Sequence, residues 1–326
     1  MLRLTLLLVF LTGASVPVKG ACPETFEVGY QVVTYGSAIT SVWYPTATPE
    51  TPYEYGPGVV GSVALDAPPV SCGKSPLVVF SHGYTGCSVQ SVFITEQLAR
   101  RGYVVAAPNH ADASCGTRVP PPPQAPIGQP RQWSDQTYLD RRADIEAVLA
   151  GILASPDFAP VTDPERIGGI GHSLGGYTLG AMAGAWPSWT DVRIKAVLLL
   201  SPYVQPFQVK KTLSGIRVPV MYQGGTLDLG ITPFLAAPGG AYDRTPAPKF
   251  FAELHAATHF AWTDMLCAKA GSVANCLNSV LNAQLIDAYG FAFLDYYLKQ
   301  EPKPLLWGNG PGLAEYRHDP KRPPVR

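Results

Sequence analysis

The chain has 326 residues, 46% of them hydrophobic, and its 24 basic side chains balance 24 acidic ones. This length and apolar content predict a globular protein that can bury one large core. The balanced charge gives no basic signature of nucleic-acid binding, so any partner must be inferred from a site.

The first twenty residues predict a secretory signal peptide. Arg3 precedes the apolar run 4–11, and small residues are frequent over 12–20. The apolar run is short for a membrane span, although a retained anchor is an alternative. Cys22 raises the possibility of a lipoprotein, which Lys19 fits poorly. We therefore expect a secreted protein, extracellular or periplasmic, without stable membrane insertion.

Six cysteines follow the expected cleavage point, and an even number in an exported chain favours disulfides. Six cysteines permit fifteen pairings. One possible set joins Cys267 to Cys276, Cys87 to Cys115 and Cys22 to Cys72. No pair has the Cys-x-x-Cys spacing of a zinc site, so we expect no metal.

The first half of the chain begins with a predicted hairpin, 28–35 and 38–44, which turns at Gly36-Ser37. A Pro-, Gly- and Thr-rich excursion over 46–75 contains one more strand at 59–65. Apolar runs at 77–80 and 103–107 are typical of buried parallel strands, and a helix is expected between them at 89–101. A Pro-rich segment, 119–130, reads as a surface spacer before a helix at about 134–154.

The second half continues the alternation of strand and helix. Strands are expected at 194–200, 217–222 and 250–254, and an apolar helix at about 281–299. The Pro-rich tail, 301–326, is expected to be loosely ordered. The pattern predicts one α/β domain over 21–300, a doubly wound, mostly parallel sheet with helices on both faces.

One short stretch, residues 167–176, has the pattern of a strand, a sharp turn and a helix around Gly171-His172-Ser173-Leu174-Gly175. A Gly-x-Ser-x-Gly turn of this kind lifts a serine hydroxyl above the sheet, where a substrate can reach it. The alternative is an ordinary Gly-rich turn of an α/β protein. Ser173 is the candidate nucleophile.

A serine needs a base, and the base needs an acid that orients it. Asp228 and His259 follow predicted strands in the order Ser, Asp, His, and complete a candidate catalytic triad with Ser173. Rivals are weaker. His255 continues the alternation of the preceding strand, and Asp264 lies too close behind His259 to be the strand-end acid.

The remaining histidines are interpreted as structural. We expect His172 to be packed or to face water, and His82 and His110 to form hydrogen bonds near the pocket. His318 belongs to the tail. The oxyanion of a tetrahedral intermediate would need two backbone N–H donors. Leu174, directly after the serine, and Tyr84, in the loop after the strand at 77–80, are the candidates. A surface aromatic on a glycine loop is the alternative for Tyr84.

Four motifs together resemble α/β-hydrolase esterases: His82-Gly83-Tyr84-Thr85, the serine turn, Gly225-Thr226-Leu227-Asp228 and Ala257-Thr258-His259-Phe260. The nearest groups are the platelet-activating-factor acetylhydrolase and dienelactone-hydrolase-like branch, with cutinase-like polyester hydrolases as relatives. Polyester hydrolases usually carry Met where Leu174 stands and often Trp in place of Tyr203. A dienelactone hydrolase proper would use Cys in place of Ser173.

The resemblance implies the α/β-hydrolase fold and a serine esterase that cleaves carboxylic esters through an acyl-enzyme, with water as acceptor and no cofactor. Tyr84 and Tyr203 would flank the substrate. Lipids or polyesters are alternative substrates. A catalytically silent binding module is an alternative of another class, against which the complete set of triad residues argues.

Overall fold

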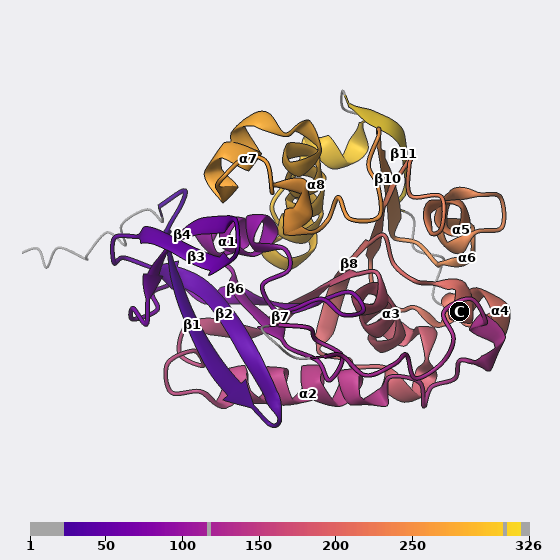
Figure 1. Cartoon of the computed structure of the whole chain (residues 1–326), viewed down its shortest axis with the longest axis horizontal. Coiled ribbons are helices and arrows are strands. Elements are labelled where there is room, and N and C mark those ends of the chain that lie inside the picture. The colour runs from indigo at the N-terminus through magenta and orange to yellow at the C-terminus, as the bar shows by residue number, and fades with distance from the viewer. Residues whose placement is uncertain (1–22, 116–118, 309–311, 321–326) are drawn as a thin grey trace, which may run out of the picture.

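A twisted β-sheet runs through the middle of the molecule, with helices packed on both of its faces (Figure 1). The computed structural model describes residues 23–115, 119–308 and 312–320. The expected signal peptide and Cys22 lie outside these residues. The predicted fold class, a mostly parallel doubly wound sheet, is confirmed.

In the described part of the chain eleven strands form the sheet, in the order β11-β10-β9-β8-β7-β5-β6-β2-β1-β4-β3. The strands from β6 to β10 are parallel to one another, while β2 and β11 run antiparallel to their neighbours β6 and β10. The strands are β1 (Glu27–Tyr35), β2 (Ala38–Thr46), β3 (Thr51–Gly56), β4 (Val59–Leu65), β5 (Ser75–Ser81), β6 (Val104–Pro108), β7 (Thr162–His172), β8 (Ile194–Leu200), β9 (Val220–Gly225), β10 (Lys249–Leu254) and β11 (Leu313–Asp319).

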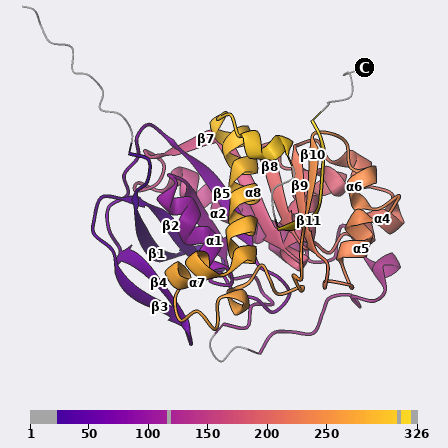
Figure 2. The same ribbon diagram turned by 90° about the horizontal axis from the view of Figure 1, so that it is seen from above.

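The sheet divides the hydrophobic core into two halves, and helices cover each half. The helices are α1 (Val92–Arg100), α2 (Leu139–Ala154), α3 (Leu174–Gly180), α4 (Gln205–Lys210), α5 (Thr232–Ala236), α6 (Ala241–Arg244), α7 (Val273–Ser279) and α8 (Leu281–Leu294). Side chains of α2, α3 and α4 fill one half of the core, and those of α1, α7 and α8 fill the other. Figure 2 shows α8 crossing its face of the sheet, and both views place α4, α5 and α6 together beside β9 and β10.

The central strands are buried because helices cover both faces, and all seven residues of β5 are buried. The expected opening hairpin is confirmed as β1 and β2, and Gly36 has the positive φ of 59° that its tight turn requires. The helix expected at 89–101 begins at Val92, where the Asp264 carboxylate accepts the N–H groups of Val92 and Phe93.

Three expectations were wrong. The excursion over 46–75 holds two strands, because β3 pairs with β4 as a hairpin. The helix expected from 134 begins at Leu139, after Tyr138 takes a φ of 63°. The tail is not loosely ordered throughout: β11 pairs along the whole of β10 and closes that edge of the sheet. Within the ranges described, no helix has the length and apolarity needed to span a bilayer.

Strands β5, β7, β8, β9 and β10 are parallel and lie next to one another in the sheet in this order. The carboxyl ends of parallel strands meet at one edge, so the loops that follow them gather there. These five loops carry the residues of the candidate site.

Candidate active site

Ser173 lies at the sharp turn between β7 and α3. Its φ of 53° and ψ of −113° are unusual for a residue with a side chain. A Cβ on Gly171 would lie 2.2 Å from the Gly175 carbonyl oxygen, and one on Gly175 would lie 1.8 Å from the Ser81 carbonyl oxygen. The turn can therefore form only with glycine at both positions.

The structure brings the three predicted triad residues together. The Nε2 atom of His259 lies 3.0 Å from the Ser173 hydroxyl, and its Nδ1 atom lies 3.3 Å from Oδ2 of Asp228. Asp228 is buried, whereas the His259 side chain is partly exposed. In this geometry Nε2 of His259 is placed to accept the serine proton, while Nδ1 faces the Asp228 carboxylate.

Ser201, the first residue after β8, also contacts the acid and the base. Its hydroxyl donates to Asp228 Oδ2 and lies 2.8 Å from His259 Nδ1, which is closer than the carboxylate. It is fully buried and has a φ of 43°. No role was predicted for Ser201 from the sequence, although it stands at a strand end like the candidate triad residues.

The rival residues lie elsewhere. His255 is exposed and lines a separate hollow with Leu281 and Gly312. Asp264 caps α1, as described above. His172 is buried, in agreement with the packed reading.

His172 joins His259 to the loop after β5 through Gln90. Its Nε2–H donates to the His259 carbonyl at 2.9 Å, and its Nδ1 accepts from Gln90 Nε2 at 3.2 Å. The Gln90 carbonyl oxygen in turn accepts the Gly83 N–H at 3.0 Å. Burial, reinforced by the neighbouring His259, lowers the pKa of His172 to about 3, so its ring stays neutral.

Tyr84 and Leu174, the candidate oxyanion donors, line the same pocket of about 600 Å³ as Ser173 and His259. Leu174 is the first residue of α3, so its N–H belongs to the free amino end of a helix. Tyr84 lies in the loop that follows β5. The structure therefore places both residues beside the serine.

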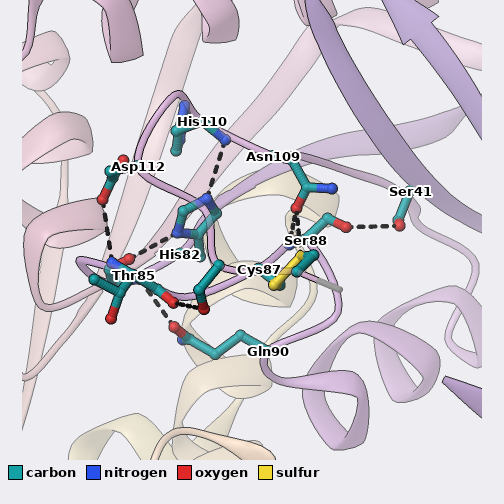
Figure 3. Close-up of a disulfide and its surroundings, with 12 residues drawn as sticks. Ser41, His82, Thr85, Cys87, Ser88, Gln90, Asn109, His110 and Asp112 are labelled. Atoms are coloured by element: carbon teal, nitrogen blue, oxygen red, sulfur yellow. Dashed lines mark hydrogen bonds between the residues drawn. A yellow bond between two sulfur atoms is a disulfide. The ribbon is translucent and has the colours of Figure 1, made fainter. Parts of the chain in front are cut away.

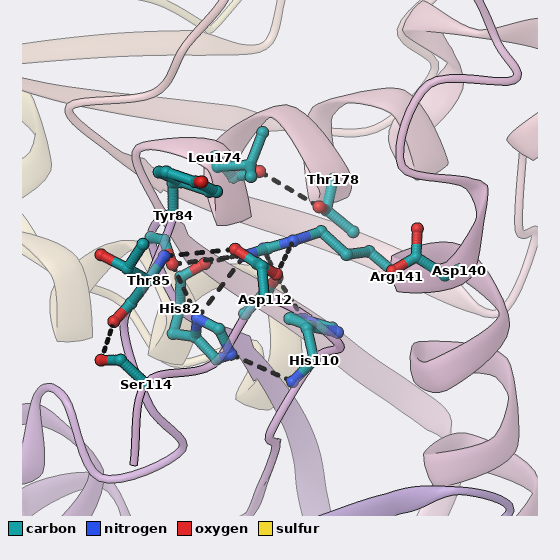
Figure 4. Close-up of polar contacts among 12 residues, drawn as sticks. His82, Tyr84, Thr85, His110, Asp112, Ser114, Asp140, Arg141, Leu174 and Thr178 are labelled. Carbon is teal, nitrogen blue, oxygen red and sulfur yellow. Dashed lines mark hydrogen bonds and ion pairs between the residues drawn. The ribbon is translucent and has the colours of Figure 1, made fainter. Parts of the chain in front are cut away.

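Arg141 of α2 holds the loop that carries Tyr84 (Figure 4). Its guanidinium is fully buried and donates to the carbonyl oxygens of His82 at 2.8 Å and Gly83 at 3.2 Å. It also pairs with Asp112, which accepts the Thr85 N–H at 3.2 Å. Burial alone would raise the pKa of Asp112, but the Arg141 charge outweighs it and holds the pKa below its usual value.

The disulfide between Cys87 and Cys115 ties the same loop to the segment after β6 (Figure 3). Beside it, the Asn109 side chain accepts the Ser88 N–H at 2.7 Å, and the Ser114 hydroxyl donates to the Thr85 carbonyl. The loop is therefore fixed on both sides of Tyr84. This pairing was one of the expected disulfides and is confirmed.

The second expected pair, Cys267 with Cys276, is confirmed as well. Cys72 is disulfide-bonded, and Cys22 lies outside the described residues. The histidines His82 and His110 are buried side by side beneath the loop, and burial lowers the pKa of each well below its usual value. They have the hydrogen-bonding role expected for them: His82 Nε2 accepts the His110 N–H, and His82 Nδ1–H donates to the Gly83 carbonyl.

The Pro-rich segment 119–130 is part of the pocket wall, so the expectation of a surface spacer was wrong. Three aromatic side chains of the site, Tyr84, Trp133 and Tyr203, donate from their polar ends to backbone carbonyls of this segment. The carbonyls are those of Pro121, Pro126 and Ile127, respectively. Ile127 lines the pocket beside Ser173, and Tyr203 is buried against it.

Among the described residues, no group of His, Cys, Asp and Glu side chains could hold a metal ion.

Comparison with known proteins identifies a family and several relatives. A model of the Alpha/beta hydrolase family matches residues 78–323. The chain is 29% identical over 189 residues to Cutinase 2 of Thermobifida cellulosilytica, which covers 56% of this chain and 60% of that protein. It is equally similar to Cutinase cut1 of Thermobifida fusca, of which it covers 49%.

A third relative, Cutinase est1 of Thermobifida alba, is 27% identical over 186 residues, 56% of this chain and 53% of that protein. The chain thus spans between about half and three fifths of the length of these curated relatives. The family model, in contrast, covers most of the chain, including every loop that carries a candidate triad residue. On that match the chain belongs to the alpha/beta hydrolase family.

Proposed function

We propose that the protein is a serine esterase in which Ser173 attacks the carbonyl carbon of a carboxylic ester. The observation that carries this proposal is the 3.0 Å contact between the Ser173 hydroxyl and His259 Nε2 inside an open pocket. The similarity to cutinases supports an ester as the substrate.

In the proposed reaction the Ser173 proton moves to His259 as the serine oxygen bonds to the carbonyl carbon. Asp228 orients the imidazole and stabilises its positive charge. The N–H groups of Tyr84 and Leu174 stabilise the oxyanion, and His259 returns the proton to the departing alcohol. Water, activated by the same imidazole, then hydrolyses the acyl-enzyme and frees Ser173.

An apolar substrate fits the walls of this pocket. Leu227, Leu229 and Phe260 line it and are each more than half exposed, so an apolar acyl or alcohol group would cover them. Tyr84 and Tyr203 would flank that group. A lipase or cutinase-like polyester hydrolase is the second candidate, favoured by the cutinase relatives. A place in the platelet-activating-factor acetylhydrolase branch stays a prediction.

Export is part of this proposal. Disulfides persist in oxidising compartments, and two pairs join described residues. They support the signal peptide predicted from residues 1–20.

The test is hydrolysis of p-nitrophenyl esters from acetate to long acyl chains by wild type, Ser173→Ala and His259→Ala. We expect both variants to lose more than about 1,000-fold in kcat. His255→Ala, four residues from the base but outside the pocket, is the matched control and should keep wild-type activity. A wild type without activity, or a Ser173→Ala variant as active as wild type, would exclude this mechanism and favour the binding module.

A further inference from the structure

A second pocket, of about 760 Å³, lies directly against the candidate active site. The two pockets share four lining residues, Ile127, Tyr203, Gly230 and Ile231. Their common wall is thus made by the Pro-rich segment, the loop after β8 and the loop after β9. A molecule bound at Ser173 that extends past these residues would enter the second pocket.

The second pocket is lined mainly by apolar side chains, and some of these come from elements that do not line the Ser173 pocket. Val209 of α4 and Phe234 of α5 contribute to it, and they are 41% and 45% exposed. Exposed apolar side chains that converge on one hollow lose water when an apolar ligand fills it. The lining therefore suits an aliphatic or aromatic chain.

One polar atom of a residue that lines this pocket has no hydrogen-bond partner among the described residues. Gln205 lines the pocket and is only 8% exposed. Its amide nitrogen donates to the Gly230 carbonyl at 3.3 Å, which fixes the orientation of the amide. The other amide atom, Oε1, is buried and accepts no hydrogen bond from any described residue. A buried acceptor without a donor is costly, so a ligand that brings a hydroxyl would be favoured here.

We propose that this second pocket binds the distal part of an ester substrate, an apolar chain whose hydroxyl donates to Gln205 Oε1 while its ester group lies at Ser173. The proposal rests on the esterase function proposed above and adds a subsite to it. The enzyme would then prefer long hydroxylated esters to short ones and to long esters that end in a methyl group.

The first experiment tests the subsite by filling the second pocket with a larger side chain. Val209→Trp places a large ring in the second pocket only, and Val192→Trp, at an 81% exposed position that lines neither pocket, is the matched control. We expect Val209→Trp to lower kcat/KM for long-chain p-nitrophenyl esters by at least about tenfold. The kcat/KM of Val209→Trp for p-nitrophenyl acetate should stay within about twofold of wild type. The kcat/KM of Val192→Trp should do so for the long-chain esters and for the acetate.

The second experiment tests the hydroxyl. Matched pairs of C8, C12 and C16 esters, with a terminal methyl or a terminal hydroxyl, are compared in wild type and Gln205→Leu. We expect wild type to prefer the hydroxylated member of at least one pair by about fivefold, and Gln205→Leu to lose that preference. The same pairs are made on the alcohol side, as alkyl and hydroxyalkyl acetates, to show which half of the ester occupies the subsite.

The subsite is excluded if Val209→Trp leaves the long esters unaffected on both the acyl and the alcohol side. The role of Gln205 is excluded if wild type shows no hydroxyl preference or if Gln205→Leu retains it. Absence of acetate hydrolysis in wild type would instead count against the esterase itself, so the two failures are distinguishable.

Discussion

A single hydroxyl, that of Ser201, lies between the acid and the base of the candidate triad. It donates to Asp228 and accepts from His259 Nδ1, so it restrains both side chains. A buried serine in a strained conformation (φ 43°) is maintained only when its surroundings require it. We infer that Ser201 positions the imidazole without touching substrate.

Ser201→Ala should therefore lower kcat about tenfold and leave KM nearly unchanged, because one hydrogen bond to the acid and base is lost. Steady-state kinetics on p-nitrophenyl acetate measure this. Ser201→Gly, which suits the positive φ and also lacks the hydroxyl, should behave in the same way. A full-activity Ser201→Gly variant would show that backbone strain, and not the hydroxyl, explains the loss in Ser201→Ala.

Tyr203 lies in the wall common to both pockets. Tyr203→Ala should raise KM for bulky esters by several-fold, about the effect of lost apolar contact, and change KM for acetate esters less. Tyr203→Phe keeps the ring and is the control. Equal changes for bulky and acetate esters would remove Tyr203 from the substrate site.

At the scale of elements, a buried carboxyl joins α1 to the β3–β4 hairpin. Glu96 accepts hydrogen bonds from the Tyr55 hydroxyl at 2.8 Å and the Ser62 N–H at 3.2 Å. A Cβ on Gly61 would lie 1.9 Å from the same carboxyl oxygen, so a side chain at this position would displace the Glu96 carboxyl group. Burial raises the pKa of Glu96 to about 7.

Since the pKa of Glu96 is higher in the folded protein than in the unfolded chain, its contribution to stability is complete below about pH 4.5 and is lost as the pH rises through 7. Glu96→Gln keeps the acceptor oxygen but does not titrate. The unfolding free energy of this variant relative to wild type should rise by about 3 kcal/mol between pH 4.5 and pH 8. Denaturant titrations at the two pH values measure it, and a constant difference would contradict the assignment.

Helix α2 holds the loop of Tyr84 through Arg141. Arg141→Met leaves the buried Asp112 carboxylate without its cation, so we expect a loss of about 3–5 kcal/mol of unfolding free energy. The double variant Arg141→Met/Asp112→Asn should recover part of this loss. Urea denaturation distinguishes the cases, and a double variant less stable than Arg141→Met would show that the charge pair is not the cause.

Elements were predictable where burial on both faces leaves a continuous apolar run, as in β5 and β8. β3 and β11 were missed for the opposite reason, since both are edge strands rich in partly exposed residues. The three candidate triad residues could be expected to lie together because each follows such a strand. Arg141 and Gln90 carry no local signal, because their partners are set by how distant segments pack.

For the whole molecule, the two described disulfides differ in how much chain they enclose. Cys87 and Cys115 are 28 residues apart in sequence, whereas Cys267 and Cys276 are 9 apart. A longer closed loop restricts the unfolded chain more. The first disulfide should therefore contribute more to stability.

Replacing both cysteines of each pair by serine tests this. We expect losses of about 3.5 kcal/mol for Cys87/Cys115 and about 2.5 kcal/mol for Cys267/Cys276. The measurement is denaturant unfolding of the two double variants beside wild type. A larger loss for the shorter loop would mean that native contacts around Cys267, and not loop length, govern the effect.

The pairing of β11 with β10 bears on how the protein avoids self-association. β10 contains Phe250 and Phe251 and ends five residues before His259, so an open edge there would offer an apolar template for a strand of another molecule. β11 covers that edge, and its charged residues Glu315 and Arg317 form an ion pair with each other. β11 therefore closes the edge of β10 to pairing with a strand of another molecule, at the side of the sheet that supplies His259.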